Sequence, residues 1–146
     1  MHFDKARLDD VDELVRIDDE DSLSPWSRQA FVDEFSRVQS RIEVARLTPT
    51  GPAIAFLCSW IVGDEVQILN LCVSIAHRRK GLAEAMLRRL TEKARAQRCR
   101  TITLDVRRSN EPAIALYHKL CFRSVGVRPA YYAEGNEDAL LMDLIL

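Results

Sequence analysis

The sequence has few of the residues that build metal centres or disulfide scaffolds. Its 146 residues include four cysteines and three histidines, and no two cysteines form a C-x-x-C pair. Glycine and proline occur five times each, and we find no repeat, linker or low-complexity tract. This pattern argues against a zinc site and favours cysteines that act as small buried hydrophobes. We therefore expect no bound metal, and a reducing, cytoplasmic location.

Long apolar runs and a strong net charge are also absent. The longest apolar run, residues 53–62, is too short to span a bilayer, and residues 1–5 carry no signal-peptide stretch. A net charge of −1 is not that of a chain built to bind nucleic acid or anionic membrane. The length suits one compact domain, so we expect a single domain over residues 1–146 with neither nucleic acid nor membrane as a direct partner.

Charge is unevenly placed along this nearly neutral chain. Residues 1–21 carry nine acidic side chains against three basic ones, whereas residues 76–100 carry nine basic side chains against two acidic ones. Two solvated faces would explain most of these side chains. The alternative is an anionic ligand near the middle of the chain and a cationic partner near its front.

Hydrophobic periodicity predicts an α+β domain with one central, mixed sheet. Helices are expected from an Asp10-x-x-Glu13 capping box to about Asp21, from a cap at Ser27 to about Arg37, over residues 81–97, and from a cap at Asn110 onward. Strands are expected at residues 2–8, 42–47, 53–62, 65–73, 101–106, 122–127 and 138–145, with Tyr131 and Tyr132 in a loop between the last two.

The segment between the strand at 65–73 and the helix at 81–97 carries three cations and a glycine, Arg78-Arg79-Lys80-Gly81. A helix start offers backbone N–H groups and partial positive charge, and a glycine there lets a phosphate approach closely. Alone, this is equally a basic loop before an ordinary amphipathic helix. It is neither a Walker loop nor a dinucleotide fingerprint, because both glycine patterns are missing.

In its wider context, the loop resembles the coenzyme A motif R-x-x-G-x-G/A of the GNAT acetyltransferases. Three further segments agree in order and spacing. They are Pro25-Trp26-Ser27; Leu104 to Asn110 followed by Ala113 to Tyr117; and Tyr131-Tyr132 followed by Glu137 to Met142. Together they resemble the RimI family, bacterial enzymes that acetylate the N-terminal alanine of a ribosomal protein. The resemblance extends from about Phe3 to Leu144.

This resemblance implies a fold, a substrate and a set of site residues. The fold would be a mostly antiparallel sheet of about seven strands with a splayed parallel pair, flanked by about four helices. The acetyl donor would be acetyl-coenzyme A, and the acceptor a protein N-terminus, with a ribosomal protein as partner. The donor would be held by Leu71, Cys72, Val73, Arg79, Lys80, Gly81, Leu82, Ala83, Glu84 and Asn110. The acceptor would meet Trp26, Tyr131 and Tyr132.

Each of these side chains also has an ordinary structural explanation. Asn110 is a plain helix cap as well as a contact to the coenzyme A arm. Tyr117 matches the tyrosine that protonates the leaving thiolate, yet it lies on an apolar helical stripe and could be a core aromatic. Tyr131 and Tyr132 could close over a peptide or pack on the sheet. Arg78 stands where a glutamine is usual, and Ala83 where the last glycine often is.

Asp105 is the departure from the family pattern that bears most on mechanism. It stands where RimI enzymes usually have a glutamate as general base, and its side chain is one methylene shorter. A relay water could fill the gap, or Asp105 could only fix the sheet edge or a peptide amine. An α-amine has a pKa of about 7.7–8.0 against about 10.4 for lysine, so part of it is already neutral at physiological pH and the demand on a base is mild.

Three functions therefore stay open. The leading one is acetylation of a protein N-terminus by direct attack on acetyl-coenzyme A, with Asp105 and Tyr117 as the catalytic pair. The second keeps the fold but takes a lysine or small-molecule amine. The third is a coenzyme A-binding module with weak activity, suggested by the shorter acid at position 105.

Overall fold

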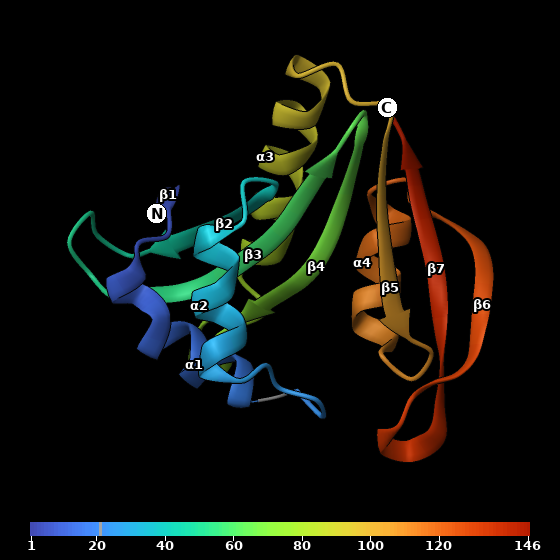
Figure 1. Cartoon of the computed structure of the whole chain (residues 1–146), viewed down its shortest axis with the longest axis horizontal. Helices are drawn as coiled ribbons and strands as arrows, with labels where there is room; N and C mark the ends of the chain where they lie inside the picture. The colour runs from blue at the N-terminus through green and yellow to red at the C-terminus, as the bar shows by residue number, and fades with distance from the viewer. Residues whose placement is uncertain (21) are drawn as a thin grey trace. The chain divides into compact units, whose positions relative to one another are not determined.

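The computed structural model describes residues 1–20 and 22–146, and Asp21, where the sequence predicts the first helix to end, lies outside the described residues. Within these ranges seven strands form one sheet in the order β1-β2-β3-β4-β5-β7-β6 (Figure 1). The strands are β1 (His2–Lys5), β2 (Ser40–Arg46), β3 (Ala53–Val62), β4 (Glu65–Val73), β5 (Thr101–Arg107), β6 (Arg123–Tyr132) and β7 (Glu137–Ile145). The helices are α1 (Val11–Asp19), α2 (Arg28–Ser36), α3 (Leu82–Ala96) and α4 (Glu111–Lys119), with short 3-10 turns η1 (Leu8–Asp10), η2 (Ile75–His77) and η3 (Glu134–Asn136).

The strand pairing confirms the expected fold class for the described residues. β1 with β2, β2 with β3, β5 with β7 and β6 with β7 are antiparallel. β4 and β5 form the parallel pair, in register from Glu65–Thr101 to Ile68–Leu104. A parallel pair needs a long crossover, and α3 supplies it. Among the helices of the described ranges, none combines the length and apolar character that crossing a membrane requires.

The chain divides into two compact units, which we describe separately. The first unit comprises Met1–Trp60 and Leu69–Arg89, and the second comprises Ile61–Ile68 and Leu90–Leu146. β3, β4 and α3 each contribute residues to both units.

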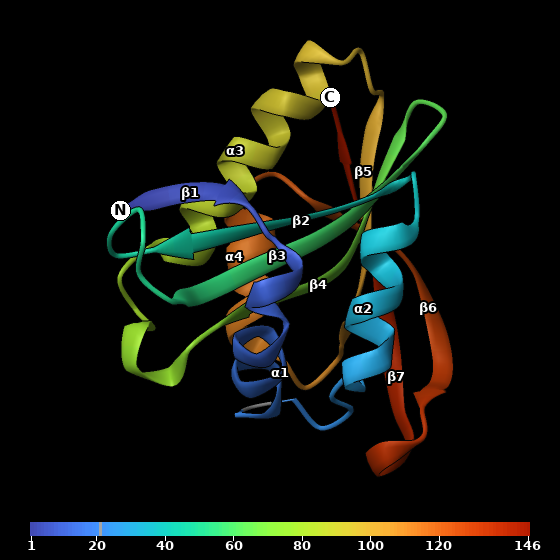
Figure 2. The ribbon, with the colours of Figure 1, turned by 60° about the vertical axis from the view of Figure 1, so that its left-hand side comes forward.

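The core of the first unit lies between the pair α1 and α2 and the strands β2 and β3. α1 buries Leu14 and Ile17 completely, and α2 buries Phe31, whose ring meets Phe56 of β3 edge-on at a centroid distance of 5.5 Å. Figure 2 shows α1 and α2 beside each other, as this shared core requires. Each such side chain contributes about 1.5–3 kcal/mol by leaving water.

The opposite side of β2 is tied to α3. Side chains alternate along a strand, so Glu43 points away from its buried neighbours Ile42 and Val44. Its carboxylate accepts a hydrogen bond from Nε of Arg89 on α3 at 2.9 Å, and the same guanidinium lies over the ring of Phe3 on β1 at 4.6 Å. This contact fixes the first turns of α3 to the sheet.

In the second unit β5 alternates as predicted, with Ile102, Leu104 and Val106 buried. Tyr117 of α4 packs against Phe122 with ring centroids 5.6 Å apart. Because α4 lies directly before β6 in the chain, this ring contact fixes the point at which β6 begins.

Two of the three predicted helix caps are confirmed. The hydroxyl of Ser27 accepts a hydrogen bond from the Ala30 amide at 3.1 Å, and Oδ1 of Asn110 accepts one from the Ala113 amide at 3.3 Å. The prediction of a capping box at Asp10 is wrong, because the Asp10 side chain accepts no hydrogen bond from the amides at the start of α1. Its carboxylate accepts instead from the Arg7 amide at 2.8 Å and from Arg46.

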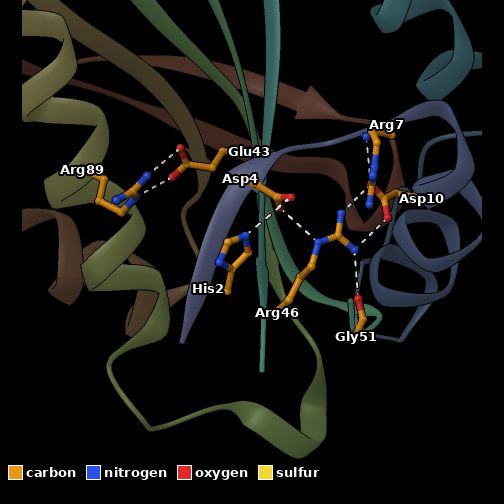
Figure 3. A network of polar contacts seen from close by, with 8 residues as sticks. All are labelled: His2, Asp4, Arg7, Asp10, Glu43, Arg46, Gly51 and Arg89. Atoms are coloured by element: carbon orange, nitrogen blue, oxygen red, sulfur yellow. Dashed lines mark hydrogen bonds and ion pairs between the residues drawn. The ribbon is translucent and has the colours of Figure 1, made fainter. Parts of the chain in front are cut away.

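A buried ion network takes the Asp10 carboxylate away from the helix (Figure 3). The Arg46 side chain is 3% exposed; its Nη1 and Nη2 donate to both oxygens of Asp10 at 2.9 and 2.7 Å, and its Nε donates to Asp4 at 3.0 Å. Burial opposes the charge on Asp10, but the Arg46 hydrogen bond and the Arg7 amide outweigh it, so the pKa of Asp10 lies below its ordinary value. The start of α1 is thereby joined to the end of β2.

We predict that Asp10→Asn destabilises the chain by about 3 kcal/mol at pH 7, because it leaves the buried Arg46 without its main counter-ion. A carboxyl whose folded pKa is lowered contributes its stability above the unfolded pKa of about 3.9 and loses it as the pH falls. In urea unfolding, the difference in the free energy of unfolding between wild type and variant should therefore become smaller between pH 5 and pH 3. Asp12→Asn, whose side chain is 81% exposed beside Arg28, should cost less than about 1 kcal/mol. A difference in the free energy of unfolding that stays constant with pH would contradict the role of the ion network.

Candidate acetyl-transfer site

The loop between β4 and α3 contains two left-handed residues. Arg79 has φ +61° and Gly81 has φ +76°. Nε of Arg78 donates to the Val73 carbonyl at 3.0 Å, so this side chain holds the loop back onto the end of β4. Arg79, Lys80 and Gly81 are exposed. The sequence suggested the glycine, but a left-handed arginine beside it carries no sequence signal.

This backbone leaves the start of α3 open to an anion. The first helical hydrogen bond runs from the Ala85 amide to the Gly81 carbonyl at 3.0 Å, so the amides of Leu82 and Ala83 have no carbonyl one turn earlier to bond. Apart from the two neighbouring residues, no atom of the protein lies within 4 Å of the position that a Cβ on residue 81 would occupy. A helix start whose first amides have no helical acceptor, with two exposed cations beside it, fits a pyrophosphate.

The half-buried segment Leu71, Cys72 and Val73 ends β4, directly before this loop. The Cys72 thiol donates to the Ile17 carbonyl of α1 at 3.4 Å. The thiol is thus occupied structurally. What the segment offers a ligand is its backbone.

Trp26 lies directly before the cap of α2 and is half-buried. Its ring packs on Phe31 with centroids 5.1 Å apart and planes at 47°. One part of the indole is therefore anchored in the core of the first unit, and the rest is accessible to a partner.

In the second unit, Asp105, Tyr117 and Tyr132 form one electrostatic cluster. Burial, and then the neighbouring Tyr132, raise the pKa of Tyr117 to about 12. Burial, and then the charge of Asp105, raise the pKa of Tyr132. Tyr117 is 8% exposed and keeps its proton at physiological pH, as an acid that delivers a proton must.

Arg128 is the cation that faces Asp105. Its Nη1 lies 4.0 Å from Oδ2 of Asp105, whose side chain is 30% exposed, and its guanidinium lies over the Tyr131 ring at 5.3 Å. The carboxylate is therefore partly accessible and lies beside a positive charge.

Tyr131 and Tyr132 are not in a loop, as the sequence suggested, but are the last two residues of β6. Ala130 adopts φ +49° and its amide donates to Oδ1 of Asp138 at 2.9 Å, which produces the register shift between Arg128 and Tyr132. Such bulges re-aim side chains at the end of a strand. From the sequence alone, the segment around Pro129 resembles a loop. The bulge that keeps it in β6 depends on Asp138 of β7, which lies outside this segment.

A second arginine supports the tyrosine pair. The guanidinium of Arg107 lies over the Tyr132 ring at 4.2 Å, and its Nη1 donates to Glu137 at 3.0 Å. Arg107 is not among the site residues that the family resemblance implies. Its position could have been predicted, because residues two apart on a strand lie on the same face of the sheet and Arg107 follows Asp105 by two.

The predicted residues thus fall into two sets. The first unit holds Trp26, Leu71 to Val73 and the loop from Arg79 to Glu84. The second holds Asp105, Asn110, Tyr117, Tyr131 and Tyr132. Within the second set, electrostatic interactions link Asp105, Tyr117 and the tyrosine pair, while Asn110 caps α4.

The chain is similar in sequence and in structure to known proteins. A sequence profile of the acetyltransferase (GNAT) family matches residues 11–122. The [ribosomal protein bS18]-alanine N-acetyltransferase of Escherichia coli K12 is 36% identical over 122 residues, 82% of this chain and 80% of that protein. An N-alpha-acetyltransferase of Saccharolobus solfataricus is 33% identical over 150 residues, 94% of this chain and 88% of that protein.

Among solved structures, the ribosomal-protein-S18-alanine N-acetyltransferase of Escherichia coli superposes with a TM-score of 0.90 at 29% identity, covering 99% of this chain and 92% of that one. A family profile that spans residues 11–122, together with relatives above 30% identity over most of their length, settles the family. The chain belongs to the acetyltransferase (GNAT) family.

Proposed function

We propose that this chain, as a single N-acetyltransferase domain, transfers the acetyl group of acetyl-coenzyme A to the N-terminal α-amine of a protein, with the N-terminal alanine of a ribosomal protein as the preferred acceptor. The observation that carries the proposal is that Arg128 lies beside Asp105 and over the Tyr131 ring, that Tyr131 packs on Tyr132, and that the buried, protonated Tyr117 interacts with Tyr132. A relative at 36% identity is described as acting on ribosomal protein bS18, which supports the acceptor.

The residues of the first unit fit the donor. The amides at the start of α3, with Arg79 and Lys80 beside them, would hold the pyrophosphate, and the backbone of Leu71 to Val73 would hold the pantetheine arm. Bound acetyl-coenzyme A would supply an activated thioester. Oδ1 of Asn110 caps α4, and the side-chain amide group of this residue would contact the coenzyme A arm.

In the second unit, the side chains have the chemistry that the transfer needs. The amine nitrogen attacks the thioester carbonyl carbon, a C–N bond forms, and the C–S bond breaks. Before the attack Asp105 would take one ammonium proton, directly or through one water. Tyr117 would give its proton to the leaving thiolate, and the second proton lost by the nitrogen would restore Tyr117. Arg128 lies beside Asp105, so the acid shares its charge with a cation, and an α-amine, with a pKa of about 7.7–8.0 against about 10.4 for lysine, needs less from a base. This favours an α-amine over a lysine acceptor.

The function is tested by incubating the protein with acetyl-coenzyme A and peptides of equal length that begin with Ala, begin with Met, or carry a blocked N-terminus and one internal lysine. We expect thiol release with the Ala peptide, less with Met and little with the blocked one. Mass spectrometry should place the acetyl group on the α-amine. Preference for the lysine peptide would overturn the acceptor assignment, and coenzyme A binding without turnover would favour a binding module.

Tyr117→Phe should lower kcat about 100-fold, because it removes the proton donor and keeps the ring that packs on Phe122. Asp105→Asn should lower kcat about tenfold or more, whereas Asp105→Glu should keep or raise it. Asp64→Asn, an acid with 61% side-chain exposure in the β3–β4 turn, is the matched control. Wild-type rates in both Tyr117→Phe and Asp105→Asn would show that neither side chain takes part in the chemistry.

Arg79→Gly should separate stability from donor binding. Glycine adopts φ +61° without the strain of a Cβ, so the free energy of unfolding should hold or rise by up to about 1 kcal/mol. Loss of the cation should weaken acetyl-coenzyme A binding about tenfold in calorimetry. Arg98→Gly, at φ +61° after the end of α3, should give the same stability change with unchanged affinity. Equal affinities in the two variants would contradict the loop's role.

A further inference from the structure

Asp18 is a buried acid in a place where the periodicity of α1 calls for an apolar residue. It follows Val11 by seven positions and Leu14 by four, both fully buried, and is itself 2% exposed. Burying a carboxylate costs more than burying a leucine unless hydrogen bonds hold it. Burial does raise the pKa of Asp18, against its two hydrogen bonds. A charged group retained here suggests a role other than packing.

The two oxygens of Asp18 bind two separate segments. Oδ2 accepts from the main-chain amide of Trp26 at 2.7 Å, and Oδ1 accepts from Nδ2 of Asn70 on β4 at 3.3 Å. The first bond is not a helix cap, because α2 begins at Arg28 and Ser27 caps it. Asp18 therefore fixes the chain before α2 at the residue whose ring is expected to meet the acceptor.

Other bonds tie the same end of α1 to the donor segment. The Cys72 thiol donates to the Ile17 carbonyl at 3.4 Å, and the Ile75 amide donates to Oε2 of Glu20 at 2.7 Å. Together with Asn70, these contacts reach both flanks of the segment 71–73. All of them lie within the first unit. The end of α1 thus joins the segment before α2 to the segment that is expected to hold the pantetheine arm.

We propose that Asp18 is a positioning residue for the acceptor: through its bonds to the Trp26 amide and to Asn70, it holds the surface that receives the peptide at a fixed distance from the β4 segment that carries the donor. This inference rests on the proposed function. Asp18 takes no part in proton transfer. Its effect is on how firmly the peptide is held, so its loss should appear in the KM for the peptide more than in the chemical step.

The test compares Asp18→Ala, Asp18→Asn and Asn70→Ala with Asp19→Ala, which removes the exposed neighbouring acid. Asp18→Ala should raise the KM for the Ala peptide at least about tenfold, with kcat and the Kd for acetyl-coenzyme A changed less than about threefold. Asp18→Asn should restore most of the KM, because its amide oxygen can accept from the Trp26 N–H. Asn70→Ala should raise KM about threefold, and Asp19→Ala should leave it unchanged.

Hydrogen exchange provides a second readout that does not depend on turnover. The Trp26 amide should exchange at least about tenfold faster in Asp18→Ala and near the wild-type rate in Asp18→Asn and Asp19→Ala. If Asp18→Ala does not fold, Asn70→Ala and Asp18→Asn decide the question.

Each failure has its own signature. A wild-type peptide KM in Asp18→Ala, with the wild-type enzyme active, would overturn this inference and leave the proposed function standing. A parallel loss of acetyl-coenzyme A affinity and peptide affinity would assign Asp18 to general folding, and would also overturn it. No turnover of any peptide by the wild-type enzyme would instead overturn the proposed function, and this inference with it.

Discussion

Two buried carboxylates, one at each end of α1, determine how the first unit is organised. Asp10 joins the start of the helix to Arg46 on β2, and Asp18 joins its end to Asn70 on β4. The apolar stripe between them packs α1 onto the core, but hydrophobic contact is not directional and would tolerate a shifted helix. Hydrogen-bonded charges do not tolerate such a shift, so they give the segments that flank α1 a defined position at a cost in desolvation.

The parts of the fold that were predictable from the sequence depend on local patterns. The caps at Ser27 and Asn110 act on amides three residues away, and the strand at residues 53–62 shows as a continuous apolar run. Asp10 has the same local signature as a cap, yet its carboxylate bonds to Arg46, 36 residues away. A partner at that distance leaves no trace in the surrounding residues, which is why the local rule fails there.

The same division holds within the site. The motif around Gly81 drew attention to the loop in which the structure shows two left-handed residues, and the periodicity of α4 placed Tyr117 on an inward face. The bulge that carries Tyr131 and Tyr132 into β6 depends on the Asp138 side chain of β7, and Asp18 acts on residues eight and 52 positions away. Residues that perform chemistry have a recognisable type and spacing, whereas residues that position them are recognised only by their contacts.

The cation beside Asp105 connects this distinction to mechanism. The Arg128 guanidinium lies 4.0 Å from the Asp105 carboxylate, so an incoming ammonium would have to share this acid with a cation already beside it. An α-amine needs little help to lose its proton, so accurate placement contributes more to its rate than basicity does. A shorter acid at position 105 is then compatible with efficient transfer, provided that the acceptor is held firmly. In the function proposed above, that task would fall to Trp26 and to the buried acid that fixes its backbone.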